Sequence, residues 1–204
     1  RSGLDLVGAR LFGPSAELAG KYSELIRAND TIDAAYRDKL ADYILRTYMP
    51  DETGKRNRVL LLLFEGENAI EKIKDVTGPL RQNMEAGETI RDTFGDYIVN
   101  NQGELVYLEP AVMIGPNARS IAQVLRLWSQ FEYSDGGIID NARDRGREEL
   151  NERTLVLIKP DNFRFPSARP GNIIDMFSRS GLRIVAAKLH RMSCAQGKEF
   201  YEPV

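Results

Sequence analysis

The sequence contains one cysteine, one histidine and one tryptophan among 204 residues, and its formal net charge is only −2. A single cysteine, Cys194, excludes a disulfide within the chain and a metal site built from cysteines alone, and it suits a reducing compartment. The small net charge predicts neither a nucleic-acid groove nor binding to an acidic membrane. The longest apolar run, residues 59–64, is too short to span a bilayer. We therefore expect a cytoplasmic protein with no nucleic acid and no membrane among its partners.

A repeat with a spacing of one domain length is the most informative feature that is present. Residues 1–7 read RSGLDLV and residues 179–185 read RSGLRIV, an offset of 178 residues (179 − 1). The same offset also matches residues 9–11 with 187–189, and one slipped position brings Tyr22 against Tyr201. Such a spacing indicates either that the sequence covers parts of two tandem domains or that it is one domain with permuted ends.

Local patterns predict an alternation of strands and helices. We expect strands at residues 4–11, 59–64, 105–108, 154–158 and 182–189, and helices at 15–26, 34–48, 69–76, 116–131 and 173–177. Residues 59–64 have the composition of a fully buried strand, and residues 79–103 are typical of a loop. The class is therefore α with β in a layered domain.

Several short motifs carry the most specific information in the sequence. The sequence TLVLIKPD at residues 154–161, followed by PGNII at 170–174 and GLRIV at 181–185, resembles the opening of the nucleoside diphosphate kinase family. FEGENA at 64–69 and GETIRDTFG at 87–95 resemble its middle. The order is anomalous, because the opening motifs follow the middle motifs in this chain.

The resemblance implies an α+β fold, a ferredoxin-like βαββαβ antiparallel sheet covered by helices. It implies the transfer of a γ-phosphate from a nucleoside triphosphate to a nucleoside diphosphate through a phosphohistidine, with Mg²⁺ accompanying the nucleotide. No residue of this chain is assigned as a metal ligand. Family members assemble as oligomers, so the resemblance also implies a homo-oligomer or a domain-swapped assembly.

The resemblance assigns five candidate nucleotide-binding residues. Lys159 matches the lysine that reaches the transferred phosphate, and Arg91 matches a phosphate-binding arginine with fork geometry. Tyr201 and its repeat counterpart Tyr22 match the tyrosine that steadies the catalytic histidine, although a core tyrosine explains each equally well. Lys74 stands where the family has a second arginine, and an exposed helix lysine is the simpler explanation for it.

The position of the catalytic histidine is occupied by Met113. Counting back from Leu127 and Trp128 along the predicted helix gives this position, and the glutamate that orients the histidine falls on Val124. A thioether cannot carry a phosphoryl group, so no residue is assigned as catalytic. The single histidine, His190, lies at the end of the second predicted copy of the first strand, where the family has no catalytic group.

Three functional hypotheses remain open. The chain is a catalytically degenerate kinase-like protein, or part of an active tandem kinase whose histidine lies beyond Val204, or a non-catalytic assembly or nucleotide-sensing module. The corresponding domain division is a kinase-like unit without its first strand and helix at residues 1–133, a charged linker at 134–150, and the opening βαβ of a second unit at 151–204. This second segment could complete the first unit, in its own chain or in a neighbour.

Overall fold

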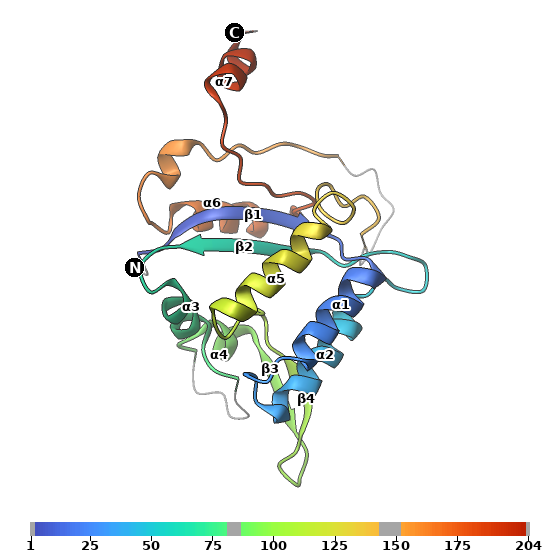
Figure 1. The fold of residues 1–204 in the computed structure, drawn as a ribbon. Helices are drawn as coiled ribbons and strands as arrows, with labels where there is room; N and C mark the ends of the chain where they lie inside the picture. The colour runs from blue at the N-terminus through green and yellow to red at the C-terminus, as the bar shows by residue number, and fades with distance from the viewer. Residues whose placement is uncertain (1–2, 81–86, 143–151, 203–204) are drawn as a thin grey trace.

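The computed structural model of the chain describes residues 3–80, 87–142 and 152–202 (Figure 1). Its helices are α1 (Ala16–Arg27), α2 (Ala34–Tyr48), α3 (Ala69–Thr77), α4 (Ile90–Phe94), α5 (Ala118–Gln130), the 3-10 helix η1 (Pro160–Phe163), α6 (Arg169–Arg179) and α7 (Cys194–Tyr201). Its strands are β1 (Asp5–Phe12), β2 (Val59–Glu65), β3 (Asp96–Val99) and β4 (Leu105–Glu109). The content of helices and strands confirms the α+β class.

The strands described form two separate antiparallel pairs, β1 with β2 and β3 with β4. In the first pair Leu11 lies opposite Leu60 and Asp5 opposite Glu65, with an irregularity between Leu6 and Gly8. The single ferredoxin-like βαββαβ sheet that the resemblance implies is therefore not assembled within the described residues.

Helices begin and end where local signals predict. Ser15 caps α1 by accepting a hydrogen bond from the Leu18 amide, and Asn117 caps α5 by accepting one from the Ser120 amide. Helix α2 has the predicted bounds and ends two residues before Pro50. These three helices supply most of the packing around the core.

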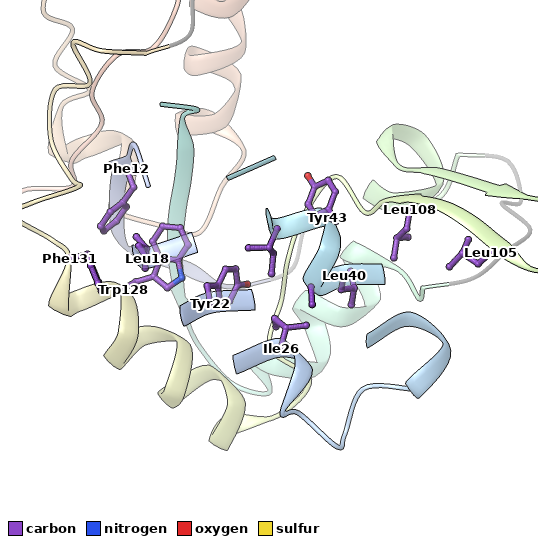
Figure 2. Close-up of a cluster of buried hydrophobic side chains, with 12 residues drawn as sticks. Phe12, Leu18, Tyr22, Ile26, Leu40, Tyr43, Leu105, Leu108, Trp128 and Phe131 are labelled. Carbon is purple, nitrogen blue, oxygen red and sulfur yellow. The ribbon is translucent and has the colours of Figure 1, made fainter. Parts of the chain in front are cut away.

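The main core lies between β1, α1, α2, β4 and α5, and Figure 2 shows its side chains. Trp128 is its centre, because its ring meets Phe12 edge-on at a centroid distance of 5.0 Å and Tyr22 at 5.6 Å. Edge-to-face aromatic pairs of this kind add to the stabilisation from burial alone. Leu18 and Ile44 are completely buried beside them.

One buried carboxylate joins three segments that are distant in the sequence. Asp135, which is 2% exposed, accepts hydrogen bonds from the Ser15 amide (2.8 Å) and hydroxyl (2.7 Å) and from Arg56 Nη1 (3.3 Å). Residues 134–142 of the expected linker thus pack against the body of the protein, where Ile139 and Ala142 are also buried. Residues 143–150 of that linker lie outside the described residues, and the domain division stays a prediction.

The two copies of the repeated segment lie side by side in space. The backbone of residues 185–189 runs antiparallel to β1, with a bridge between Arg10 and Lys188 and a hydrogen bond from the Leu11 amide to Ala187 O (3.1 Å). Residues 1–2 of the first copy lie outside the described residues.

Four expectations from the sequence are corrected. Residues 79–103 are not a plain loop, because α4 and β3 lie within them. Strand β2 is not fully buried, since alternate residues along it are exposed. Residues 154–158 do not form a strand, and residues 182–189 contribute an extended run with one bridge instead of a regular strand. Both runs have strand propensity, but a strand also requires a partner along its length.

Candidate functional site

A cavity of about 690 Å³ opens between α2, α3, α4 and the segment that precedes α5. Its wall includes Lys74 from α3, Arg91 from α4 and Met113, three positions at which the family resemblance places the phosphate ligands and the histidine. These residues come from widely separated parts of the sequence, so the fold gathers them. The wall also carries the acidic residues Asp33, Glu71 and Asp75.

Arg91 is held rigidly at the wall of this cavity. Its guanidinium is buried (6% exposed) and donates hydrogen bonds from Nη1 to Gly78 O (2.7 Å) and from Nη2 to Val112 O (3.3 Å). Nε has no hydrogen-bond partner within the described part of the chain. Burial lowers the pKa of Arg91, and Tyr97 raises it in part. A guanidinium in a protein nevertheless stays protonated, so the site holds a fixed positive charge.

The local geometry around Arg91 depends on a close contact between α3 and α4. Thr89 caps α4 by accepting a hydrogen bond from the Asp92 amide. Gly78, which ends α3 with φ of +82°, lies so close to Thr89 that an added Cβ would stand 2.2 Å from its hydroxyl oxygen. Only glycine fits this position, because it tolerates both the positive φ and the close approach.

Lys74 is a more mobile charge than Arg91. Its ammonium forms an ion pair with Glu71 one helical turn away (2.8 Å), and both side chains are partly exposed. Exposed pairs of this type contribute little to stability, so the ammonium can exchange Glu71 for another anion at small cost.

A second, smaller cavity of about 40 Å³ adjoins the first and shares Met113 with it. Its lining includes Tyr22 and Val124. Residues 22, 113 and 124 are the positions at which the resemblance places the tyrosine, the histidine and the glutamate of a catalytic histidine site. In this chain the three side chains are a phenol, a thioether and an isopropyl group. Tyr22 is buried, and burial raises its pKa, so it is a neutral core residue at ordinary pH.

The remaining predicted residues lie apart from both cavities. Lys159 is exposed just before η1, and Tyr201 is 66% exposed in α7, where it contacts Phe200. His190 is exposed and lines neither cavity. The structure thus brings Lys74, Arg91 and Met113 together, and it does not bring Lys159 or Tyr201 to them.

Sequence reasoning did not find the part of the wall that comes from residues 31–36 and 78–80. The signal for it was present at Thr89, because a threonine followed three residues later by Asp92 is a helix-start pattern. That pattern would have placed α4, and with it the wall around Gly78.

The described part of the chain shows no metal site at this cavity. Within residues 3–80, 87–142 and 152–202, no three or more histidine, cysteine, aspartate and glutamate side chains are grouped to hold a metal ion. The described residues therefore offer no ready set of ligands for a resident Mg²⁺. In the same residues, no helix is long and apolar enough to cross a membrane.

The fold and the cavity define an α+β protein whose cavity wall carries acidic side chains and one fixed positive charge, the guanidinium of Arg91. In comparisons with known proteins, its C-terminal residues 152–204 match the family model described as nucleoside diphosphate kinase. The chain is 50% identical over 50 residues to a nucleoside diphosphate kinase of Staphylothermus marinus, covering 24% of this chain and 34% of that protein. It is 48% identical over 50 residues to one from Halorhodospira halophila, with the same two coverages. No solved structure gives a significant match.

Residues 152–204 are therefore similar to part of the nucleoside diphosphate kinases. The chain spans about a third of the length of the curated relatives it matches, and residues 1–151 lie outside the region matched by the family model.

Proposed function

We propose that this chain is a nucleoside diphosphate kinase-like protein that binds the phosphates of a nucleoside di- or triphosphate in the cavity of Lys74 and Arg91, without turning it over. The observation that carries the proposal is the convergence of Lys74, Arg91 and Met113 on one cavity. The 50% identity of the matched segment to nucleoside diphosphate kinases supports the choice of ligand.

Arg91 would act as the fixed phosphate ligand. A guanidinium has more N–H donors than the two that bind Gly78 O and Val112 O, and its planar fork suits phosphate oxygens. Lys74 would add a second positive charge after leaving Glu71. The acidic residues on the wall oppose a bare polyphosphate, so the nucleotide would bind as its Mg²⁺ complex, in which the metal neutralises part of the phosphate charge.

Phosphoryl transfer through the protein would fail at its first step. Residue 113 would have to attack the γ-phosphate, and a methionine sulfur forms no stable phosphoryl bond. Val124 cannot accept a hydrogen bond, so it could not orient an imidazole at residue 113. A cavity that keeps a phosphate ligand and has lost its nucleophile supports a nucleotide-sensing or regulatory role.

Titration calorimetry with Mg²⁺-ADP tests the binding. We expect heat in the native chain, and affinity reduced about 3- to 10-fold in Lys74→Ala, since one partly screened charge is removed. Lys159→Ala is the matched control, because Lys159 lies outside the cavity, and it should leave the affinity unchanged. No heat at millimolar ADP, or a loss in Lys159→Ala alone, would contradict the proposal.

A second experiment tests the missing chemistry. After incubation with γ-labelled ATP and Mg²⁺, the native chain should carry no acid-labile phosphate. Appearance of a labelled phosphoenzyme would refute the degenerate assignment even if nucleotide binding were confirmed.

A second candidate function rests on the segment at residues 152–204. It keeps Lys159, Pro160 and Asp161 together and matches the family at about 50% identity. Both observations support a second, ferredoxin-like unit that retains the opening motif of the family sequence. In that case an active tandem kinase would carry its histidine beyond Val204. The complete reading frame decides this, because an Asn-x-x-His-Gly motif downstream would support it and its absence would exclude it.

A further inference from the structure

The β3–β4 hairpin leaves the outer edge of β3 without a partner strand. Among the residues that the structure describes, β3 and β4 pair only with each other, and Figure 1 shows their turn projecting beyond the helices. The Asn100 amide donates to Glu104 O (2.9 Å) across the turn, so the backbone groups of Asn100 face β4. Successive residues of a paired strand turn these groups to opposite sides. The backbone groups of Val99 and Tyr97 therefore face away from β4, along the open edge.

Apolar side chains are exposed on both faces of β3. One face packs on the core, because Tyr97 contacts the main core cluster, to which the buried residues Leu105 and Leu108 of β4 belong. Val99 shares this face with Tyr97, since side chains alternate along a strand, and it is 38% exposed. On the other face Ile98 is 54% exposed. An open edge with exposed apolar side chains is a site for the addition of another strand.

The outer face of the hairpin also carries two like charges opposite each other. Asp96 shares this face with Ile98 and lies directly opposite Glu109 in the register of the two strands. Like charges opposed across an antiparallel pair destabilise it. The hydrogen bond that Glu109 accepts comes from the Tyr107 hydroxyl (2.7 Å), a neutral group that leaves the charge in place. A cation bound beside these two carboxylates would relieve their repulsion.

Negative charge is concentrated in this part of the sequence. Residues 87–109 contain five carboxylates and one cation, a net charge of −4, so the remaining residues sum to +2 (−2 + 4). The cation is Arg91, which is buried and donates to Gly78 O and Val112 O, so it does not neutralise the surface of the hairpin. A partner with positive and apolar side chains therefore complements the hairpin both in charge and in its exposed apolar surface.

We infer that the open edge of β3 binds a strand of another protein in which lysine or arginine residues alternate with apolar residues. The apolar side chains of this strand lie beside Tyr97 and Val99, and the basic side chains lie beside Asp96 and Ile98. The aliphatic stems of the basic side chains cover Ile98, and their charged ends reach the carboxylates. Residues 96–109 are not among the described residues that line the larger cavity, so the inference is independent of nucleotide binding.

Fluorescence anisotropy with labelled eight-residue peptides tests the recognition. A peptide of alternating lysine and valine should bind saturably with a dissociation constant below about 100 μM. Two matched peptides, one of alternating lysine and serine and one of alternating glutamate and valine, should bind at least about tenfold more weakly, since each lacks one of the two complementary features. No saturable binding of the lysine–valine peptide would overturn the inference. Equal binding of either matched peptide would also overturn it.

Charge reversal on the hairpin locates the binding surface. Asp96→Lys should weaken binding of the lysine–valine peptide about 3- to 10-fold and strengthen binding of the glutamate–valine peptide, because it reverses one charge beside the bound strand. Glu199→Lys, an exposed change on α7, alters the net charge of the chain equally and should leave both affinities unchanged. Equal effects of the two substitutions would show attraction to the overall charge only and would overturn the inference.

A proline at residue 99 tests the addition of a strand through the main chain. Val99→Pro removes an amide that faces away from β4, so the hairpin keeps its own hydrogen bonds. We expect the lysine–valine peptide to bind about 3- to 10-fold more weakly than to Val99→Ala, which keeps the amide. The fluorescence of Trp128 checks that both variants retain the core. Equal affinities of two folded variants would overturn the proposed strand addition.

Discussion

Arg10 and Lys188 occupy equivalent positions of the repeat, 178 residues apart (188 − 10), and the structure joins them in an antiparallel bridge. The hydrogen bonds on either side, from the Leu11 amide to Ala187 O and from the Leu189 amide to Ala9 O, extend the pairing. The two copies of the repeated segment therefore pair with each other around a local twofold axis. This contact fastens residues 152–202, the C-terminal arm, to the rest of the protein.

Leu189→Pro tests how the arm is fastened. Proline removes the amide that donates to Ala9 O, so the arm should open more often. We expect hydrogen exchange at the Leu11 amide to become about 3- to 10-fold faster, which corresponds to the loss of one net hydrogen bond. Leu189→Val keeps the amide and should preserve the native rate. Unchanged protection in the proline variant would show that the remaining contacts suffice.

Arg91→Leu should destabilise the protein through its two carbonyl partners. Gly78 O and Val112 O would lose their donor, and an unsatisfied buried acceptor costs about 1–3 kcal/mol. Urea unfolding should report a loss in that range for the free energy of unfolding. Lys74→Ala, a partly exposed position on the same cavity, should change it by less than about 0.5 kcal/mol. Equal effects of the two substitutions would contradict the different roles assigned to these residues.

Trp128 makes the core directly observable. It is the single tryptophan of the chain and is 4% exposed among Phe12 and Tyr22, so its fluorescence should follow the unfolding of this core. Phe12→Ala should lower the free energy of unfolding by about 3–5 kcal/mol, because it leaves a cavity against the indole. Phe94→Ala, at a position that is 72% exposed, should change it by less than about 0.5 kcal/mol. Similar losses at both positions would refute this assignment of the core.

Two tyrosines of the core, buried Tyr22 and partly buried Tyr48, should limit stability at alkaline pH. Burial raises the pKa values of Tyr22 and Tyr48 above the ordinary value of 10.0, so both stay neutral in the folded state after they would ionise in the unfolded state. Their stabilising contribution is complete below pH 10 and is lost as the pH rises above it. Each group adds a slope of up to about 1.4 kcal/mol per pH unit. Tyr22→Phe should flatten the alkaline limb of unfolding, whereas Tyr133→Phe, at a position that is 91% exposed, should not.

Elements with local signals were predictable from the sequence. Ser15 and Asn117 mark helix starts, and Pro50 marks a helix end, because each acts on backbone within a few residues of itself. The strands expected at residues 154–158 and 182–189 are not formed, and local signals could not show this, since pairing depends on a partner distant in the sequence. The alternating exposure of β2 has the same origin: its apolar composition suits burial on both faces, but one face stays exposed among the residues that the structure describes.

The candidate site was predictable only as far as its motifs were local. The motif around Arg91 and the helix count back to Met113 named two residues that share a cavity. Lys159 was assigned by an equally clear motif, but it lies in the arm, outside that cavity. A motif predicts the role of a residue in its own unit. It does not predict whether that residue lies beside the other residues of the site, and Lys159 does not.

Asp135 has a consequence for the kinetics of folding. Its carboxylate binds Ser15, 120 residues earlier in the chain, and a contact that closes so long a loop forms late, because the entropy of closure must be overcome first. Interactions that form after the folding transition state act mainly on the rate of unfolding. The bonds of Asp135 should therefore lengthen the lifetime of the folded protein more than they speed its formation.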